Sequence, residues 1–139
     1  MIFVDSNVFV YAVGRSHPLR DEAQTFFLES KKRGVPLVTS AEVLQELLHV
    51  YLPVGRIETL DAALELAIGC VDHIFPIDAD TVTRARTLVD LHPGLTARDL
   101  LHLSVCQGNN IKGIKTFDRN LLAAFKRRSE RRRPSGLPR

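Results

Sequence analysis

Cysteine and long apolar runs are both scarce in this sequence. The two cysteines, Cys70 and Cys106, lack any Cys-x-x-Cys or Cys/His spacing, which argues against a disulfide-bonded scaffold or a zinc site. No stretch approaches the roughly 20 apolar residues of a membrane span. The apolar opening MIFVDSNVFVYAV is interrupted by Asp5 and Asn7 and has no basic leader, so a strand is expected there rather than a signal peptide. We therefore expect a cytoplasmic protein, without membrane contact, whose two thiols are reduced core residues.

Internal repeats are also absent, and the composition, 45% hydrophobic and 25% charged over 139 residues, is that of one ordinary globular domain. The net charge of +3 hides an uneven distribution. Seven of the 19 Lys and Arg residues follow Phe125, so residues 1–125 hold 12 basic and 15 acidic residues and a net charge of −3. We predict a mildly acidic domain over residues 1–128 and a disordered basic tail over residues 129–139, where apolar side chains are nearly lacking.

Strand-like and helix-like segments alternate along the chain. The apolar run of residues 1–5 favours a strand buried on both faces, and Ser40 is a good N-cap for the helical pattern that follows it. The expected strands are residues 1–5, 35–39, 73–77 and 113–116, and the expected helices are residues 18–32, 40–53, 56–70, 78–91, 96–107 and 118–128. Strands joined by helices imply a parallel sheet covered on both faces. We predict an α/β fold, a three-layer α/β/α sandwich with a central, mainly parallel sheet of four strands, a fifth being left open.

Acidic side chains gather at the expected carboxyl ends of these strands. Asp5 follows the first strand and Asp118 the fourth, and ligands of open parallel sheets bind at that edge. Asp99 lies in the first turn of a helix, and Glu46 lies at the border of the apolar stripe of another. Four carboxylates brought together repel one another unless a hard divalent cation such as Mg²⁺ or Mn²⁺ binds among them. Such a site could polarise a phosphodiester and activate a water molecule.

Each acid also has a purely structural interpretation. Asp99 completes a capping box, Asp118 can cap its own helix, and Glu46 can be a solvated charge, with Glu42 one turn earlier as a rival for its role. Asp5 is the hardest to explain in this way, because a carboxylate among apolar neighbours is unfavourable unless it is paired or metal-bound.

Four blocks of the sequence together resemble the motifs of PIN-domain nucleases, especially the VapC-type toxins of toxin–antitoxin pairs. The blocks are MIFVDSNVFVYA, TSAEVLQEL, ARDLLHLSVC and KTFDRNL, and the similarity spans about residues 1–125. The order, the spacing and the acid in every block agree with the family. The resemblance implies the following site: catalytic Asp5, Glu46, Asp99 and Asp118, of which Asp5, Asp99 and Asp118 bind metal, with Asn7 and Thr116 in support.

The resemblance also implies a function. It predicts an Mg²⁺- or Mn²⁺-dependent endoribonuclease that acts as a toxin, forms a homodimer and is blocked by the C-terminal segment of a small antitoxin. The chain departs from many relatives at Asn120, where they place a further acid, and in its arginine-rich tail, where they commonly have a short apolar strand.

An acidic cleft repels phosphate, so basic residues on its rim must help to hold RNA. The nearest candidates in sequence are Arg15, Arg98, Lys115 and Arg119. The tail's arginines can add salt-sensitive contacts or serve only as a solubilising extension. His102, one turn beyond Asp99, invites a general-base role, but its apolar helical neighbours favour a structural histidine.

Other functions fit less well. An aspartyl-nucleophile phosphatase wants a second acid where this chain has Asn7, and a receiver domain needs a phosphoacceptor after its third strand, where only Asp78 is available. The alternative from another class is a catalytically silent PIN-like domain that binds RNA or docks proteins. A mutually repelling acidic cluster would serve no purpose in such a module.

Overall fold

The computed structural model describes residues 1–131, with side chains as far as Arg128. In this part of the chain the strands are β1 (Ile2–Val4), β2 (Leu37–Ser40), β3 (His73–Phe75) and β4 (Gly113–Lys115). The helices are α1 (Ser6–Ala12), α2 (Pro18–Arg33), α3 (Ala41–Tyr51), the 3₁₀ turn η1 (Leu52–Val54), α4 (Ile57–Cys70), α5 (Ala79–Thr87), α6 (Ala97–Gly108) and α7 (Arg119–Arg131).

The four strands form one parallel sheet in the order β3-β2-β1-β4. Phe3 of β1 is in register with Val38 of β2 on one side and with Ile114 of β4 on the other. Phe3 and Val4 have no exposed surface, because β1 is central and both faces of the sheet are covered. The carboxyl ends of all four strands therefore lie at one edge of the sheet.

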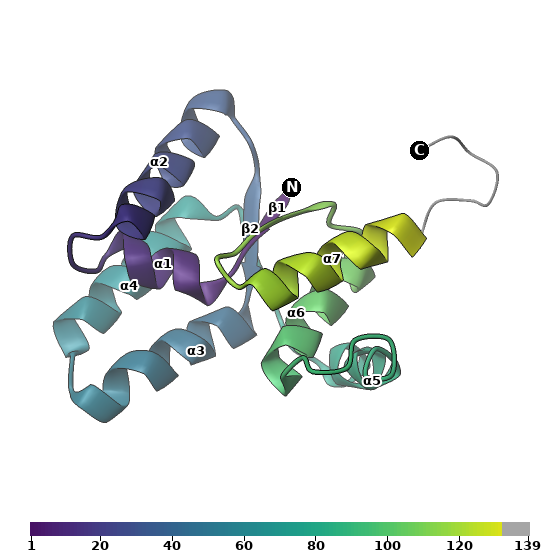
Figure 1. Ribbon diagram of the computed structural model, residues 1–139. Helices are drawn as coiled ribbons and strands as arrows, with labels where there is room; N and C mark the ends of the chain where they lie inside the picture. Colours follow the sequence, from purple (N-terminus) through teal and green to yellow (C-terminus); the bar gives the residue numbers. More distant parts are fainter. Residues whose placement is uncertain (132–139) are drawn as a thin grey trace.

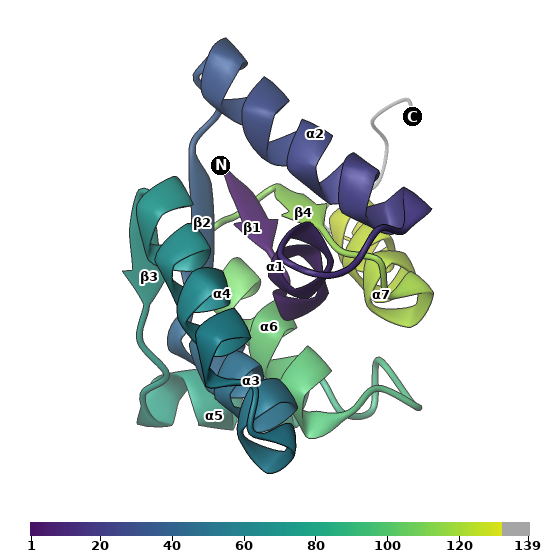
Figure 2. The same cartoon turned by 90° about the vertical axis from the view of Figure 1, so that its left-hand side faces the viewer.

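The sheet separates two layers of helices. Figures 1 and 2 show α1 to α4 on one face and α5 to α7 on the other. The largest fully buried apolar side chains come from the sheet and from both layers: Phe3, Phe9, Leu47, Leu103, Ile111 and Leu121. The predicted three-layer α/β/α sandwich with a four-stranded sheet is confirmed.

Three sequence expectations need correction. Helix α1 was missed: it begins directly after Asp5, because the Asp5 carboxylate accepts a hydrogen bond from the backbone N–H of Ser6 and caps the helix at once. Helix α5 ends at Thr87, well before residue 91, in a run of turns. Cys106 is buried as expected, but Cys70, on the last turn of α4, is exposed.

The expected tail overlaps the described residues only in part. Helix α7 continues to Arg131, three residues past its expected end, and the rest of the predicted disordered tail lies outside the described residues. None of the helices that the structure describes has the length and apolar character to cross a membrane.

Candidate active site

Asp5 stands at the carboxyl end of β1 and is almost fully buried, with 5% of its surface exposed. Its Oδ1 accepts a 2.7 Å hydrogen bond from the backbone N–H of Ser6. Its Oδ2 accepts hydrogen bonds from the Thr116 hydroxyl at 2.7 Å and from the Asn7 side-chain amide at 3.3 Å. Burial raises the pKa of Asp5, although His102 and the Thr116 hydroxyl act in the opposite direction. The chain's own groups therefore compensate the Asp5 charge only in part.

Glu46 projects from α3 toward the same point. Its Oε2 accepts a 2.7 Å hydrogen bond from the Ser6 hydroxyl, and its Oε1 lies 2.6 Å from Nε2 of His102. Burial alone would raise the pKa of Glu46, but the hydrogen bond and the charge of His102 and the Ser6 hydroxyl outweigh it, so the pKa is lowered. Glu46 is thus held as a carboxylate beside Asp5.

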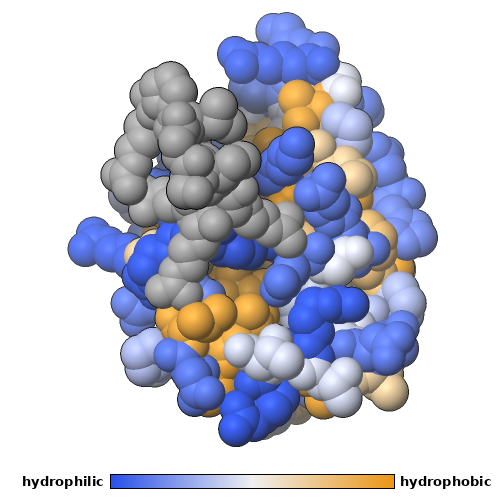
Figure 3. Space-filling view, turned by 90° about the vertical axis from the view of Figure 1, so that its right-hand side faces the viewer, coloured by the Kyte–Doolittle hydropathy of each residue, from blue (hydrophilic) through white to orange (hydrophobic). Residues whose placement is uncertain are grey.

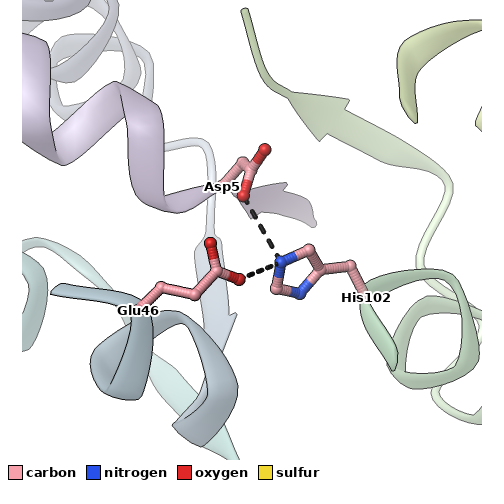
Figure 4. A group of neighbouring side chains, drawn as sticks. All are labelled: Asp5, Glu46 and His102. Carbon is pink, nitrogen blue, oxygen red and sulfur yellow. Dashed lines mark ion pairs between the residues drawn. The ribbon is translucent and has the colours of Figure 1, made fainter. Parts of the chain in front are cut away.

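His102 on α6 lies between the two acids. Its side chain is 1% exposed, and its Nε2 is 3.5 Å from Oδ1 of Asp5 as well as 2.6 Å from Glu46 (Figure 4). Burial lowers the pKa of His102, but Glu46 and Asp5 raise it more, so the net shift is upward. The apolar helical neighbours of His102 had favoured a purely structural role for it. The sequence did offer one signal, because His102 lies one turn after Asp99 and therefore on the same side of α6.

Two of the expected acids stand apart from this cluster. Among the described residues, the close group of potential metal-ligand atoms, all within 4.8 Å of one another, belongs to Asp5, Glu46 and His102. Asp99 completes the capping box of α6, where its Oδ2 accepts a 3.3 Å hydrogen bond from the backbone N–H of Thr96. Its charge nevertheless acts on His102 and raises the pKa of that residue.

Asp118 begins α7 and is tied to Asp5 through one hydroxyl. Its Oδ1 accepts hydrogen bonds from the backbone N–H groups of Asn120 and Leu121, at 2.9 and 3.1 Å, so it caps the helix. Its own backbone N–H donates to the Thr116 hydroxyl oxygen at 3.0 Å, and that hydroxyl donates to Asp5. The structure therefore places Asp118 one hydrogen-bonded residue away from Asp5 without direct contact between their carboxylates.

The polar residue Asn7 joins the same network from α1. Its Nδ2 donates to Thr116 Oγ1 as well as to Asp5, both at 3.3 Å, and its Oδ1 accepts a 3.1 Å hydrogen bond from the backbone N–H of Phe117. Asn7 thereby fixes the loop after β4 against the end of β1.

The four basic residues expected to bind RNA differ in whether they form ion pairs with acidic residues of the chain. Arg98 forms an ion pair with Glu42 at 3.6 Å. Glu42, the rival for the role of Glu46, therefore faces this arginine and not the cluster of Asp5, Glu46 and His102. Lys115 pairs with Glu22 at 3.1 Å and lies over the aromatic rings of two neighbouring phenylalanines. Two of the four basic residues are exposed and make no ion pair among the described residues: Arg15 and Arg119.

The donor set suits a divalent cation. Two carboxylates from different elements converge on one point, one of them buried and held only in part by protein hydrogen bonds. Carboxylate oxygen is the ligand that Mg²⁺ and Mn²⁺ prefer, and a doubly charged ion would relieve the repulsion between the two acids. Asp99 and Asp118 each use one carboxylate oxygen as a helix cap, which leaves the other oxygen of each for a ligand or a water molecule.

Comparison with known proteins agrees with this geometry. The PIN-domain family model matches residues 2–128, so the chain belongs to the PIN-domain family. Its relatives place it among the VapC-type ribonucleases. It is 56% identical over 126 residues to Ribonuclease VapC23 of Mycobacterium tuberculosis, covering 91% of this chain and 99% of that protein. It is 41% identical over 119 residues to Ribonuclease VapC13 of the same organism, covering 86% of this chain and 91% of VapC13.

Solved structures match the fold at lower identity. The crystal structure of Mycobacterium tuberculosis VapC20, a sarcin-ricin loop cleaving toxin, superposes with a TM-score of 0.76 at 18% identity, covering 89% of this chain and 95% of that chain. VapBC2 from Rickettsia felis, bound to a DNA fragment from its promoter, gives a TM-score of 0.63 at 19% identity, covering 91% and 92%. These two matches support the three-layer architecture.

Proposed function

We propose that this protein is an endoribonuclease that hydrolyses RNA phosphodiesters with the aid of Mg²⁺ or Mn²⁺, and that it is the cytoplasmic toxin of a toxin–antitoxin pair. The observation that carries the proposal is the convergence of the buried Asp5 carboxylate and the partly buried Glu46 carboxylate on one point at the carboxyl edge of the sheet. Two curated relatives with a similar chain length are named ribonucleases, which supports RNA as the substrate class.

Each acid has a distinct part in this proposal. Asp5 would hold the cation together with Glu46, which was not among the metal ligands expected from the sequence, and the expected ligands Asp99 and Asp118 would complete the cluster from the starts of α6 and α7. When bound, the cation supplies positive charge to the phosphate and lowers the pKa of its water molecule. Water as the nucleophile means that no covalent enzyme intermediate forms and that the products carry 5′-phosphate ends.

Neighbouring side chains keep the acids in position. Thr116 and Asn7 fix Oδ2 of Asp5, while Ser6 fixes Oε2 of Glu46 through its hydroxyl. These contacts leave the carboxylates little rotational freedom, so their arrangement exists before RNA arrives and need not be formed during the reaction.

Basic side chains would guide RNA to this edge. Of the four expected residues, Arg15 and Arg119 support the role best because they are exposed and unpaired among the described residues, whereas Arg98 and Lys115 would first have to leave their glutamates. Contacts of this kind act on phosphates and carry no sequence information.

We also propose a small antitoxin and a second copy of this chain as protein partners. A hollow of about 800 Å³ between α2 and α4 is lined largely by apolar side chains, among them Phe27, Leu66 and the 70% exposed Leu28. Figure 3 shows that hydrophobic residues, in orange, also reach the surface on the side of α5 to α7, between hydrophilic residues in blue. On α5 and just after it, Val82, Val89 and Leu91 are exposed by 52%, 39% and 45%. Exposed apolar surface of this kind is typical of protein interfaces.

Cleavage of structured RNA tests the proposal. The purified protein should cut RNA internally in Mg²⁺ or Mn²⁺, leave 5′-phosphate ends and lose activity in EDTA. Asp5→Asn and Glu46→Gln should each abolish cleavage. Asp78→Asn is the matched control, because Asp78 caps α5 in the same chemical manner but outside the cluster, and it should cleave normally. Binding of RNA without metal-dependent cleavage, or products with 2′,3′-cyclic phosphates, would instead favour the silent module or a different mechanism.

A further inference from the structure

A third potential ligand atom, a nitrogen of His102, lies beside the Asp5 and Glu46 carboxylates where they converge. Nε2 of His102 lies 2.6 Å from Glu46 Oε1 and 3.5 Å from Asp5 Oδ1. Ligands of one small cation, each about 2.1 Å from the ion, lie about 3 Å from one another. The two nitrogen–oxygen distances fall on either side of that value, so small side-chain shifts would let one ion contact all three groups.

His102 is held for such a role by packing. Its ring lies 5.4 Å from the ring of Phe3, centroid to centroid, in the centre of the sheet, and its Nδ1 is buried without a hydrogen-bond partner. Both polar interactions of the imidazole are at Nε2, which Figure 4 shows facing both carboxylates, and without an ion this nitrogen carries the proton that it shares with Glu46. An ion between the two acids would take the place of this proton, because its charge favours release of the Nε2 proton and the freed lone pair could then bind the ion.

A nitrogen ligand changes which ion the site prefers. Carboxylate and water oxygens suit Mg²⁺, whereas imidazole binds first-row transition-metal ions much better than it binds Mg²⁺. We propose that His102 Nε2, Asp5 and Glu46 together bind a first-row transition-metal ion such as Mn²⁺ in preference to Mg²⁺. The inference rests on the proposed function in one respect only, namely that this cluster binds a divalent cation.

Pulsed electron paramagnetic resonance of bound Mn²⁺ tests the ligand directly. The full-length protein, purified without a histidine tag, is loaded with one equivalent of Mn²⁺ after growth with ¹⁴N- or ¹⁵N-histidine. A histidine nitrogen on the ion should give a modulation that changes with the isotope. This isotope-dependent modulation should vanish in His102→Gln. It should persist in His73→Gln, a control at an exposed histidine on β3. Bound Mn²⁺ without histidine modulation in the wild type, or an unchanged signal in His102→Gln, would overturn the assignment.

Calorimetric titration with each ion tests the preference. His102→Gln should weaken Mn²⁺ binding by about 10-fold or more and Mg²⁺ binding by less than about threefold, because glutamine removes the nitrogen ligand and leaves the oxygen ligands. Equal losses for the two ions would refute the preference. If His102→Gln does not fold, the isotope comparison on the wild type still decides.

The two proposals fail in distinguishable ways. Metal-dependent RNA cleavage by a protein whose bound Mn²⁺ shows no histidine nitrogen would overturn the ligand assignment and leave the nuclease proposal intact. A folded protein that binds neither Mn²⁺ nor Mg²⁺ and cuts no RNA would overturn both.

Discussion

The Thr116 hydroxyl makes three hydrogen bonds that tie the acids of the site together, and removing it should show what that network contributes. It donates to Asp5 Oδ2 at 2.7 Å and accepts from Asp118 N at 3.0 Å and from Asn7 Nδ2 at 3.3 Å. Thr116→Val keeps the shape of the side chain and deletes all three. A hydrogen bond to a charged group contributes about 1.5–3 kcal/mol, and two donors also lose their acceptor. We expect the free energy of unfolding to fall by about 2–4 kcal/mol.

Urea unfolding of the metal-free protein in EDTA measures this loss. Thr39→Val is the matched control, because Thr39 is also buried but its hydroxyl donates a single 2.8 Å hydrogen bond to the uncharged carbonyl of Val4. That control should lose only about 1 kcal/mol. In an Asp5→Asn background the effect of Thr116→Val should shrink by at least half, since the acceptor is then neutral. If Thr116→Val loses no more stability than Thr39→Val, or if its effect does not depend on Asp5, the charge-assisted network proposed here is wrong.

Three further predictions concern the same cluster and its support. Asp5→Asn should abolish cleavage but raise the melting temperature of the metal-free protein near pH 7. The melting temperature rises because burial raises the pKa of Asp5, so folding disfavours its charged form; a lower melting temperature would contradict this. Folding raises the pKa of His102 above 6.5, so the stability that its charge contributes in EDTA should be complete below pH 6.5 and be lost as the pH rises through the raised pKa. Thermal melts at several pH values would show this dependence, and His102→Gln should lack it. Gly108→Ala should lower the free energy of unfolding by about 1–2 kcal/mol, because the new methyl group overlaps the Arg84 guanidinium, which donates a hydrogen bond to a carbonyl of α6. Gly69→Ala has open space around the new methyl group and should raise the free energy of unfolding by up to about 1 kcal/mol. Equal effects of the two substitutions in urea unfolding would refute the steric argument.

Local chemistry was enough to predict most of the fold. Ser40, Asp78 and Thr96 each cap the expected helix, since a cap depends on side chains within three or four residues. The alternation of strands and helices then fixed the parallel sheet. The exception was α1, because SNVFVYA is rich in β-branched and aromatic residues that favour strands, and tertiary packing of Val8 and Phe9, both fully buried, overrode that preference.

The site could be predicted only where it follows from the end of a strand or from the apolar stripe of a helix. Asp5 was identified because a strand-end carboxylate among apolar residues has few structural explanations, and Glu46 because it borders an apolar stripe. The contact of His102 with both acids could not be read from the sequence, since it depends on how closely α6 approaches α3 across the end of the sheet. Likewise, the pairing of Lys115 with Glu22 joins residues that are far apart in the chain.

Two of the acids that we assign to the site also cap helices with the same side chains. Asp5 starts α1 and Asp118 starts α7, each by accepting hydrogen bonds from nearby backbone N–H groups. A glutamate at either place would carry the charge but overshoot the backbone, and an alanine would remove both functions at once, so a dead alanine variant could simply have a frayed helix. Asparagine retains a capping oxygen while discarding the charge. Laboratory inactivation at these two positions is therefore informative only with that amide.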